Sequence, residues 1–227
     1  MPDVFVVVVL QKNEFVHSHR IIVTCCERHG TIRLVAIVHA LPPELDAFRA
    51  EFDGFADEAA ALAKPLSDDQ FNWQPAPDEW SIAQCLEHLN ATTRAYLPTL
   101  DVGIEEAIRK GVYGPGPYHY NLIGRLLVRS MEPPVKRRFT APKAFLPQPR
   151  RSKGETLPAF RAYQTQLIDR LRQAHGLDLA RARVASPVYA WLRMPLGSAF
   201  GMMVAHERRH LWQALQVLGK RSFPAHR

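Results

Sequence analysis

The stretch SIAQCLEHLNATTRAYLPTL, from Ser81 to Leu100, gives the clearest indication of the fold class. Its apolar side chains recur at steps of three and four residues, which is the period of a helix with one buried face; they are Ile82, Cys85, Leu86, Leu89, Tyr96 and Leu100. Ser81 and Gln84 form the pattern of a capping box, in which each side chain accepts a hydrogen bond from the other residue's amide. We therefore predict a helix from about Ile82 towards Lys110, with a proline at position 98 where it can bend.

The same period occurs on both sides of this stretch. Before it, a helical pattern follows Pro42 and stops at Pro65; after it, patterns run from Leu157 to Ala174 and from Ser198 to a predicted left-handed cap at Gly219. A shorter pattern, NLIGRLLVRSM, lies in the proline-rich crossing between the second and third long helices. Four long amphipathic helices with one long crossing predict an all-α fold, a four-helix bundle.

Residues 1–40 differ from the rest, because VFVVVVL, RIIVTCC and TIRLVAIVH are short and rich in Val and Ile, as strands are. The pattern leaves open whether this segment is a small β appendage or a disordered extension. We predict three parts: an N-terminal extension over residues 1–40, the bundle over residues 41–220 and a C-terminal tail over residues 221–227.

The composition is typical of a globular protein and does not indicate which reaction, if any, it catalyses. The chain has 227 residues, 47% of them hydrophobic and 22% charged, as in an ordinary globular domain. The net charge of +7 permits contact with polyanions. Three cysteines, two of them adjacent, do not suggest a disulfide framework and favour a reducing cytoplasm. The apolar run from Val4 to Leu10 is too short to cross a bilayer, so we expect no membrane partner.

Two histidines one helical turn apart, His206 and His210, are the first candidates for chemistry. On a helix they lie about 40° apart and can hold one divalent cation, or they can be incidental histidines of a packed helix. The H-E-x-x-H spacing is that of zinc peptidases, but no third ligand follows at the required distance. Glu207 points about 100° away from His206, so we predict a residue at the surface or behind the ligands and not a catalytic base. A third ligand is expected upstream. His88, at the edge of the apolar stripe, is one candidate, and His119 and His175, which lie in or beside loops, are less rigid alternatives.

The chain resembles the DinB-like superfamily of metalloenzymes. The resemblance is carried by LSDDQFNWQPAPDEWSIAQCLEHLN and by MVAHERRHLWQALQVL, and it extends from about Leu45 to Leu218. It implies that His88, His206 and His210 are the ligands of a divalent metal, zinc or nickel. It also implies an enzyme that activates a thiol or water, a thiol S-transferase or a hydrolase, acting on a small-molecule substrate with a low-molecular-weight thiol such as bacillithiol or mycothiol as a cosubstrate.

Three further residues are candidates for the surroundings of the metal. Cys85 and Tyr96 share a helix with His88, and Gln213 follows His210 by three residues, so each is placed to line the pocket or support a ligand. A packed core thiol is the competing interpretation of Cys85. Trp80 is expected to pack at the helix entry.

A non-catalytic bundle that binds metal or anions is the alternative. Lysines and arginines are concentrated between positions 125 and 153, a stretch with the single acid Glu132. Such a run can contact phosphates, but motifs that read bases are absent, so nucleic acid is not the expected partner. The sequence leaves the oligomeric state open, including a homodimer.

Overall fold

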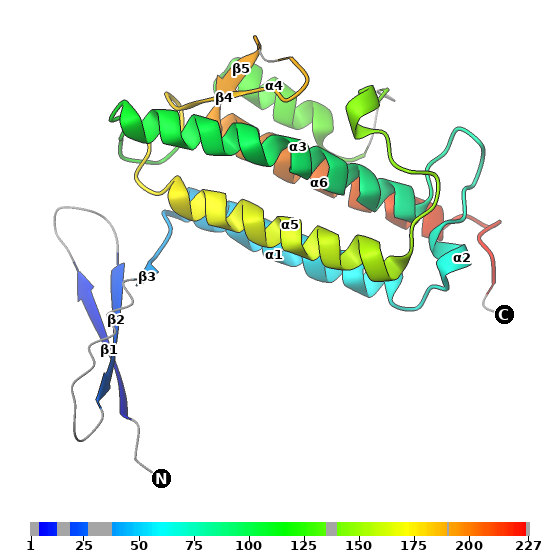
Figure 1. Cartoon of the computed structure of the whole chain (residues 1–227), viewed down its shortest axis with the longest axis horizontal. Helices are drawn as coiled ribbons and strands as arrows, with labels where there is room; N and C mark the ends of the chain where they lie inside the picture. The colour runs from blue at the N-terminus through cyan, green and yellow to red at the C-terminus, as the bar shows by residue number, and fades with distance from the viewer. Residues whose placement is uncertain (1–4, 13–18, 27–37, 135–139, 190, 226–227) are drawn as a thin grey trace.

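The structure is a computed structural model that describes residues 5–12, 19–26, 38–134, 140–189 and 191–225, with side chains from Ala40 onward. Four long helices lie along one another and form the body of the molecule (Figure 1). They are α1 (Pro43–Ala63), α3 (Ile82–Arg109), α5 (Lys153–Gln173) and α6 (Leu196–Leu218). The predicted all-α four-helix bundle is therefore confirmed.

The capping box predicted at the start of α3 is present. The Ser81 hydroxyl accepts from the Gln84 amide at 3.1 Å, and the Gln84 carboxamide oxygen accepts from the Ser81 amide at 2.9 Å. These two bonds satisfy amide groups that would otherwise lack partners, because Ser81 is fully buried. The box fixes where α3 begins, and with it the height of His88 in the bundle.

The apolar stripes of the four helices meet in one core. The largest fully buried side chains include aromatic and aliphatic residues from all four helices: Phe52, Phe160, Phe200, Leu45, Ile82, Leu86, Leu89, Leu100, Ile104, Leu167 and Leu171. Burial of such side chains is the main favourable contribution to folding, at about 1.5–3 kcal/mol each.

The crossing between α3 and α5 carries the short helix α4 (Leu122–Met131) and the 3₁₀ turn η1 (Lys143–Phe145). Helix α4 lies against α6. A second short helix, α2 (Asp68–Phe71), connects α1 to α3, and the hairpin of β4 (Arg183–Ala185) and β5 (Arg193–Pro195) leads into α6. The long crossing is thus as predicted, and it brings η1 to the first part of α3, at His88.

Three strands precede the bundle. Strand β1 (Phe5–Lys12) pairs antiparallel with β2 (His19–Cys26), and β2 pairs with β3 (Val38–His39). Figure 1 draws them to one side of the helices. Of the two interpretations left open for residues 1–40, the described part follows the β one.

Two helix ends differ from the sequence prediction. Helix α5 begins at Lys153, before the predicted Leu157, and so contains Pro158. The Asn90 amide of α3 donates to the Thr156 carbonyl at 3.2 Å, which holds this first part of α5 against its neighbour despite the proline. Gly219 is not a left-handed cap, because its φ is −77°. The left-handed conformation is found instead at Gly111, after α3, where φ is 64°, and at Gly176, after α5, where φ is 80°.

Among the described residues no helix is both long and apolar enough to cross a membrane.

Gly103 of α3 packs directly against β4, where an added Cβ would lie 2.7 Å from the Arg183 carbonyl oxygen. We expect Gly103→Ala to lower the free energy of unfolding by about 1–3 kcal/mol, because the backbone of β4 has to move. Gly54 of α1 is the matched control, since a Cβ added there would meet nothing within 4 Å. Gly54→Ala is expected to raise stability by about 0.5–1 kcal/mol through helix propensity. Urea unfolding of both variants measures this, and equal changes would contradict the close contact.

Candidate metal centre

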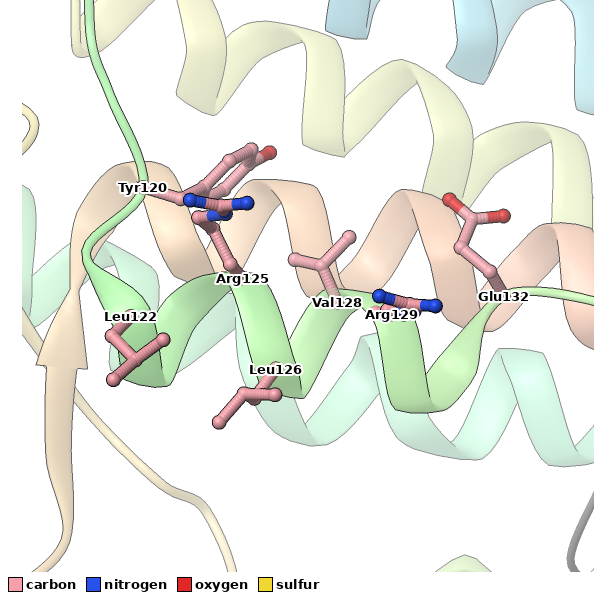
Figure 2. Close-up of a pocket in the computed structure, with 7 residues that line it drawn as sticks. All are labelled: Tyr120, Leu122, Arg125, Leu126, Val128, Arg129 and Glu132. Atoms are coloured by element: carbon pink, nitrogen blue, oxygen red, sulfur yellow. The ribbon is translucent and has the colours of Figure 1, made fainter.

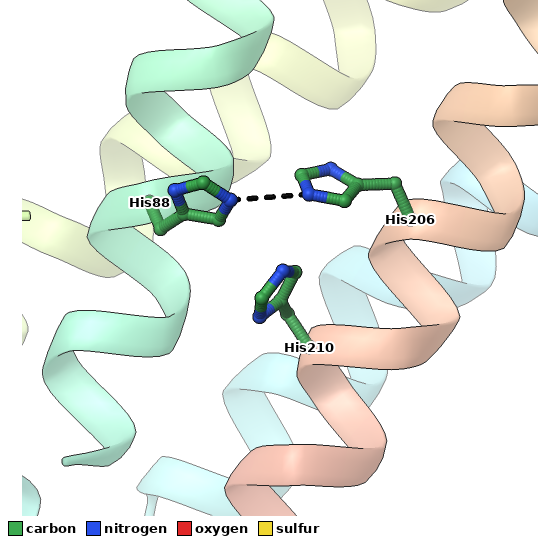
Figure 3. Close-up of side chains that lie close together, drawn as sticks. All are labelled: His88, His206 and His210. Atoms are coloured by element: carbon green, nitrogen blue, oxygen red, sulfur yellow. Dashed lines mark hydrogen bonds between the residues drawn. The ribbon is translucent and has the colours of Figure 1, made fainter. Parts of the chain in front are cut away.

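The histidines of two helices converge between α3 and α6. His88 projects from α3, and His206 and His210 project from successive turns of α6 (Figure 3). One nitrogen of each ring lies within 4.8 Å of the corresponding nitrogens of the other two. The Nε2 atoms of His88 and His206 are 3.1 Å apart. Two nitrogens that share a tetrahedral cation at bond lengths of about 2.0–2.1 Å are separated by roughly 3.3 Å, so this spacing suits a common ligand sphere.

Two of the rings are oriented by carbonyl oxygens. The Nδ1 atom of His88 lies 2.7 Å from the backbone oxygen of Phe145 in η1, and Nδ1 of His210 lies 3.1 Å from the side-chain oxygen of Gln213. A carbonyl oxygen only accepts, so in each ring Nδ1 carries the proton and donates it. The Nε2 lone pairs of His88 and His210 are left for a cation, which is the usual arrangement of ligating histidines.

Burial keeps the three imidazoles neutral. His88 is 4% exposed and His210 is 7% exposed. Burial lowers the pKa of His206 to about 3, and the pKa of His88 and of His210 also lies below the ordinary value for the same reason. The positive charge of Arg209 lowers the pKa of all three further. Neutral imidazoles with free lone pairs are the protonation state that metal binding requires.

Trp80 forms one wall of the site. Its ring is stacked on His210, with centroids 5.6 Å apart and planes 27° apart, and lies 4.8 Å from the ring of His88. The sequence predicted only that Trp80 packs at the helix entry. A contact of Trp80 with His88 could have been predicted from its position directly before the Ser81 cap, about two helical turns ahead of His88 along the chain. The Phe145 carbonyl left no signal, because any residue supplies a backbone oxygen.

The three residues predicted around the metal have different positions. Gln213 contacts His210, as described above. Cys85 is fully buried, and burial raises the pKa of its thiol, so it is a core thiol with little thiolate at neutral pH. Burial raises the pKa of Tyr96 to about 12, and its hydroxyl faces Ser186 after β4, not the histidines. The described contacts therefore place Gln213, but neither Cys85 nor Tyr96, at the imidazoles.

Glu207 was expected either at the surface or behind the ligands. The surface position is wrong. Glu207 is 2% exposed and lies beside Gln164 of α5, although neither carboxylate oxygen makes a hydrogen bond of normal geometry among the described residues. Burial raises its pKa to about 8. The 100° offset from His206 directs the side chain into the bundle core, and helix packing then removes it from solvent.

The two arginines between the ligands have different partners. Arg208 forms ion pairs with Glu51 of α1 at 2.7 Å and with Glu132 after α4 at 2.6 Å. Arg209 is 7% exposed and its Nη1 donates to the Ser130 carbonyl at 3.3 Å. Arg208 therefore ties α6 to two neighbouring segments, and Arg209 contributes a positive charge near the histidines.

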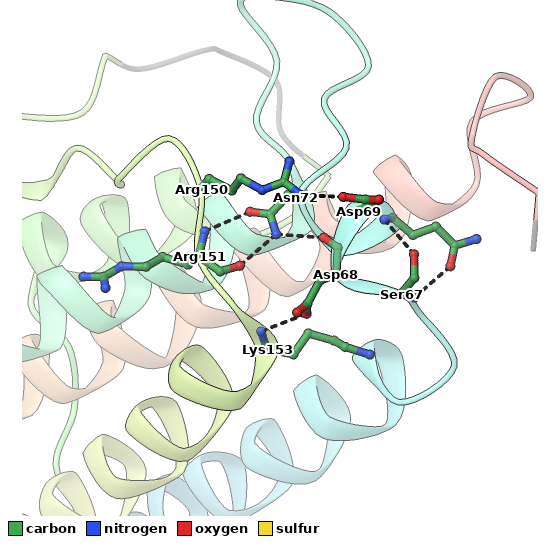
Figure 4. Close-up of polar contacts among 8 residues, drawn as sticks. Ser67, Asp68, Asp69, Asn72, Arg150, Arg151 and Lys153 are labelled. Carbon is green, nitrogen blue, oxygen red and sulfur yellow. Dashed lines mark hydrogen bonds and ion pairs between the residues drawn. The ribbon is translucent and has the colours of Figure 1, made fainter.

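The basic run of the crossing is partly neutralised where the structure describes it. Figure 4 shows Asn72 after α2 exchanging hydrogen bonds with the backbone of Arg151, at 2.7 and 2.9 Å. Arg150 pairs with Asp69, and Lys153 donates to a backbone oxygen at the end of α1. These contacts fasten the end of the crossing to α2. Lys136, Arg137 and Arg138 lie outside the described residues.

Comparisons with known proteins agree with this architecture. A family model described as the DinB superfamily matches residues 51–214. The chain belongs to the DinB superfamily. The match confirms the resemblance seen in the sequence motifs, and it contains all three histidines. No curated protein matches the chain.

One solved structure with this fold is YfiT from Bacillus subtilis, described as a probable metal-dependent hydrolase with an unusual four-helix bundle topology. It is similar to this DinB-superfamily chain with a TM-score of 0.50 and 14% sequence identity, over 78% of this chain and 88% of that one. At this identity the likeness shows the fold.

The buried Glu207 carboxyl makes stability depend on pH. Its pKa of about 8 exceeds the ordinary 4.5, so the folded chain holds a proton that the unfolded chain releases. The resulting stabilisation is complete below pH 4.5 and is lost as the pH rises towards 8. We expect Glu207→Gln to be more stable than the parent chain by roughly 1–3 kcal/mol at pH 8 and nearly equal to it at about pH 5.

Urea unfolding at the two pH values measures this difference. Glu58→Gln, a change at an exposed position of α1, is the control and should alter stability little at either pH. A Glu207→Gln variant that is less stable than the parent chain at pH 8 would show instead that the carboxylate has a stabilising partner.

Proposed function

We propose that this chain is a metal-dependent enzyme in which His88, His206 and His210 hold one divalent cation, zinc or nickel. The observation that carries the proposal is the convergence of three neutral imidazoles within 4.8 Å, of which His88 and His210 are buried and His206 is partly exposed. Imidazole nitrogens suit zinc and nickel, and three protein ligands leave a position open for a reacting molecule. Family membership and the description of YfiT as a probable metal-dependent hydrolase support it.

The residues around the site prepare it for a small substrate. The Phe145 carbonyl and the Gln213 carboxamide hold two rings with Nε2 facing inward. Trp80 covers the stacked His210 and keeps water from that side. Arg209 adds positive charge without being a ligand. Together these groups provide a rigid donor set, one apolar wall and a field that favours an anionic nucleophile.

The reaction class follows from two features of the site: the nucleophile that a bound cation would activate, and the general bases that lie near it. A divalent cation lowers the pKa of water or of a thiol, so that either becomes a nucleophile near neutral pH. Among the described residues, the cluster contains no carboxylate that could serve as a general base. Hydrolysis is the first candidate because of the likeness to YfiT. Thiol S-transfer is the second, because a thiol needs a smaller pKa shift than water and thus depends less on a base.

The proposal extends to the cosubstrate, the compartment and the oligomeric state. A low-molecular-weight thiol is the cosubstrate of the second candidate reaction. The reducing cytoplasm inferred from the cysteines suits such a thiol, and Cys85 is free in the structure. A homodimer also stays a prediction.

Metal content tests the proposal directly. Untagged protein, incubated with zinc or nickel and freed of excess ion, is expected to retain about one equivalent by elemental analysis. His88→Ala, His206→Ala and His210→Ala should each lose it, while helicity by circular dichroism is unchanged. His119→Ala, at an exposed position before α4, is the control and should retain the ion. Retention below about a tenth of an equivalent by the parent chain after loading would overturn the proposal.

The Gln213 contact predicts a graded effect. Without its carboxamide, His210 loses the acceptor that fixes its ring, so Gln213→Ala should weaken metal affinity by about 10–100-fold without abolishing binding. Gln216→Ala, at an exposed position one turn further along α6, should leave the affinity unchanged. Competition with a chromogenic chelator measures both. Equal affinities for the two variants would show that the Gln213 contact does not position the ligand.

A further inference from the structure

The outward face of α4 is apolar and basic. Gly124 rests on α6, where an added Cβ would lie 2.5 Å from the Ser198 hydroxyl oxygen. On the opposite side of the helix, Leu122 is 71% exposed and Leu126 is 59% exposed. Arg125 and Arg129 project from the same side by helical spacing, and Figure 2 shows all four side chains leaving α4 (Leu122, Arg125, Leu126 and Arg129). We call these four residues the α4 face.

The α4 face is an unusual surface, because leucines occupy the centre of its exposed side. A surface helix normally carries polar residues there. Ile123, beside the face, is 76% exposed as well. A hollow of about 460 Å³ adjoins the face, with both arginines in its lining. Contiguous exposed apolar surface of this kind marks an interaction site.

The charge around the α4 face is mainly positive. The one acid in the lining of the hollow, Glu132, forms an ion pair with Arg208. Residues 107–131, which include α4, contain no Asp or Glu, and neither do residues 179–206, which include β4, β5 and the start of α6. Arg125 and Arg129 are exposed, and neither forms an ion pair with another described residue. An occupant of this surface therefore has to be anionic as well as apolar.

Exposed aromatic side chains lie at the end of the bundle where α4 begins. The loop between β4 and β5 carries Tyr189 and Trp191, which are 55% and 81% exposed and have ring centroids 6.1 Å apart. Figures 1 and 2 both show this hairpin beside the start of α4. Trp and Tyr are the residues enriched where proteins meet the headgroup region of a bilayer.

A second copy of the chain fits this surface less well than a lipid surface does. Across a two-fold axis the α4 face would meet its own arginines. The acid in the lining of the adjoining hollow, Glu132, already forms an ion pair with Arg208, so it offers little to neutralise them. Anionic lipids offer phosphates to the arginines and acyl chains to the leucines, and they need no matched shape from the convex side of a helix.

We propose that the α4 face, with Tyr189 and Trp191, is a peripheral docking surface for anionic phospholipid membranes. The leucines and the tryptophan enter the interface, and Arg125 and Arg129 contact lipid phosphates. Such a contact is peripheral and needs no membrane-spanning segment. The expectation of no membrane partner was based on the short apolar run at the N-terminus, which could not span a bilayer, so it does not apply to peripheral binding. The proposal is independent of the metal site.

Vesicle sedimentation of the full-length protein tests the proposal. Large unilamellar vesicles of phosphatidylcholine with about 30% phosphatidylglycerol should bind it at least about tenfold more tightly than vesicles of phosphatidylcholine alone, and added salt should weaken the binding. The double variant Arg125→Gln/Arg129→Gln should bind about 30-fold more weakly, roughly fivefold for each arginine. Leu122→Gln/Leu126→Gln should weaken binding by about tenfold or more, because its apolar contacts are lost.

Matched controls separate this face from general charge and hydrophobicity. Arg161→Gln/Arg172→Gln removes the same charge from exposed positions of α5, and Val102→Gln/Ile108→Gln removes exposed apolar groups from α3. Both controls should bind within about twofold of the parent chain. The blue shift of tryptophan fluorescence on adding anionic vesicles should disappear in Trp191→Phe. Of the other tryptophans, Trp73 packs on Phe223, Trp80 on His88, and Trp212 lies in the later part of α6, away from this loop.

Three results would overturn the proposal. One is a parent chain that does not bind anionic vesicles. Another is binding that the α4 variants and the α5 controls weaken equally. The last is self-association by light scattering that Leu122→Gln/Leu126→Gln abolishes without vesicle binding by the parent chain, which would assign the α4 face to a second copy.

Discussion

The candidate site exists because α3 packs against α6. One helix supplies one imidazole and the other supplies two, so no single element holds the three-histidine group. A rotation of α3 by one residue, about 100°, would move His88 out of the group, and the same rotation of α6 would move both His206 and His210 out of it. The capping box at Ser81 sets where α3 starts, and the apolar stripes set which sides of the two helices meet. The donor set is therefore a product of core packing.

Burial links the stability of the bundle to the chemistry of the site. The same exclusion of water that stabilises the core keeps the imidazoles uncharged and holds a proton on Glu207. Each buried polar group has a free-energy cost, which hydrogen bonds to carbonyl oxygens offset at His88 and His210. Glu207 has no comparable bond among the described residues. The bundle therefore accommodates this buried carboxyl by keeping it protonated.

The crossing between α3 and α5 does more than connect two helices. Its 3₁₀ turn delivers the Phe145 carbonyl to His88, and its last residues are fastened to α2 through Asn72. Helix α4, in the same crossing, packs on α6 with one side and exposes leucines and arginines on the other. A segment that looked irregular in sequence thus supports the site at one end and presents the α4 face at the other.

Local patterns along the chain were enough to predict the four long helices, their apolar faces and the pair His206 and His210, because periodicity, capping and motif spacing each involve residues close together in sequence. His88 was assigned as the third ligand through the family resemblance, since no local pattern links it to a pair more than a hundred residues away. The same patterns could not predict the position of Trp80 against His210, the burial of Glu207, the Phe145 contact or the conformation of Gly219. Each of these depends on which segment packs on which, at separations along the chain that no local pattern encodes. They are set when the core closes, because only then do distant segments come into contact.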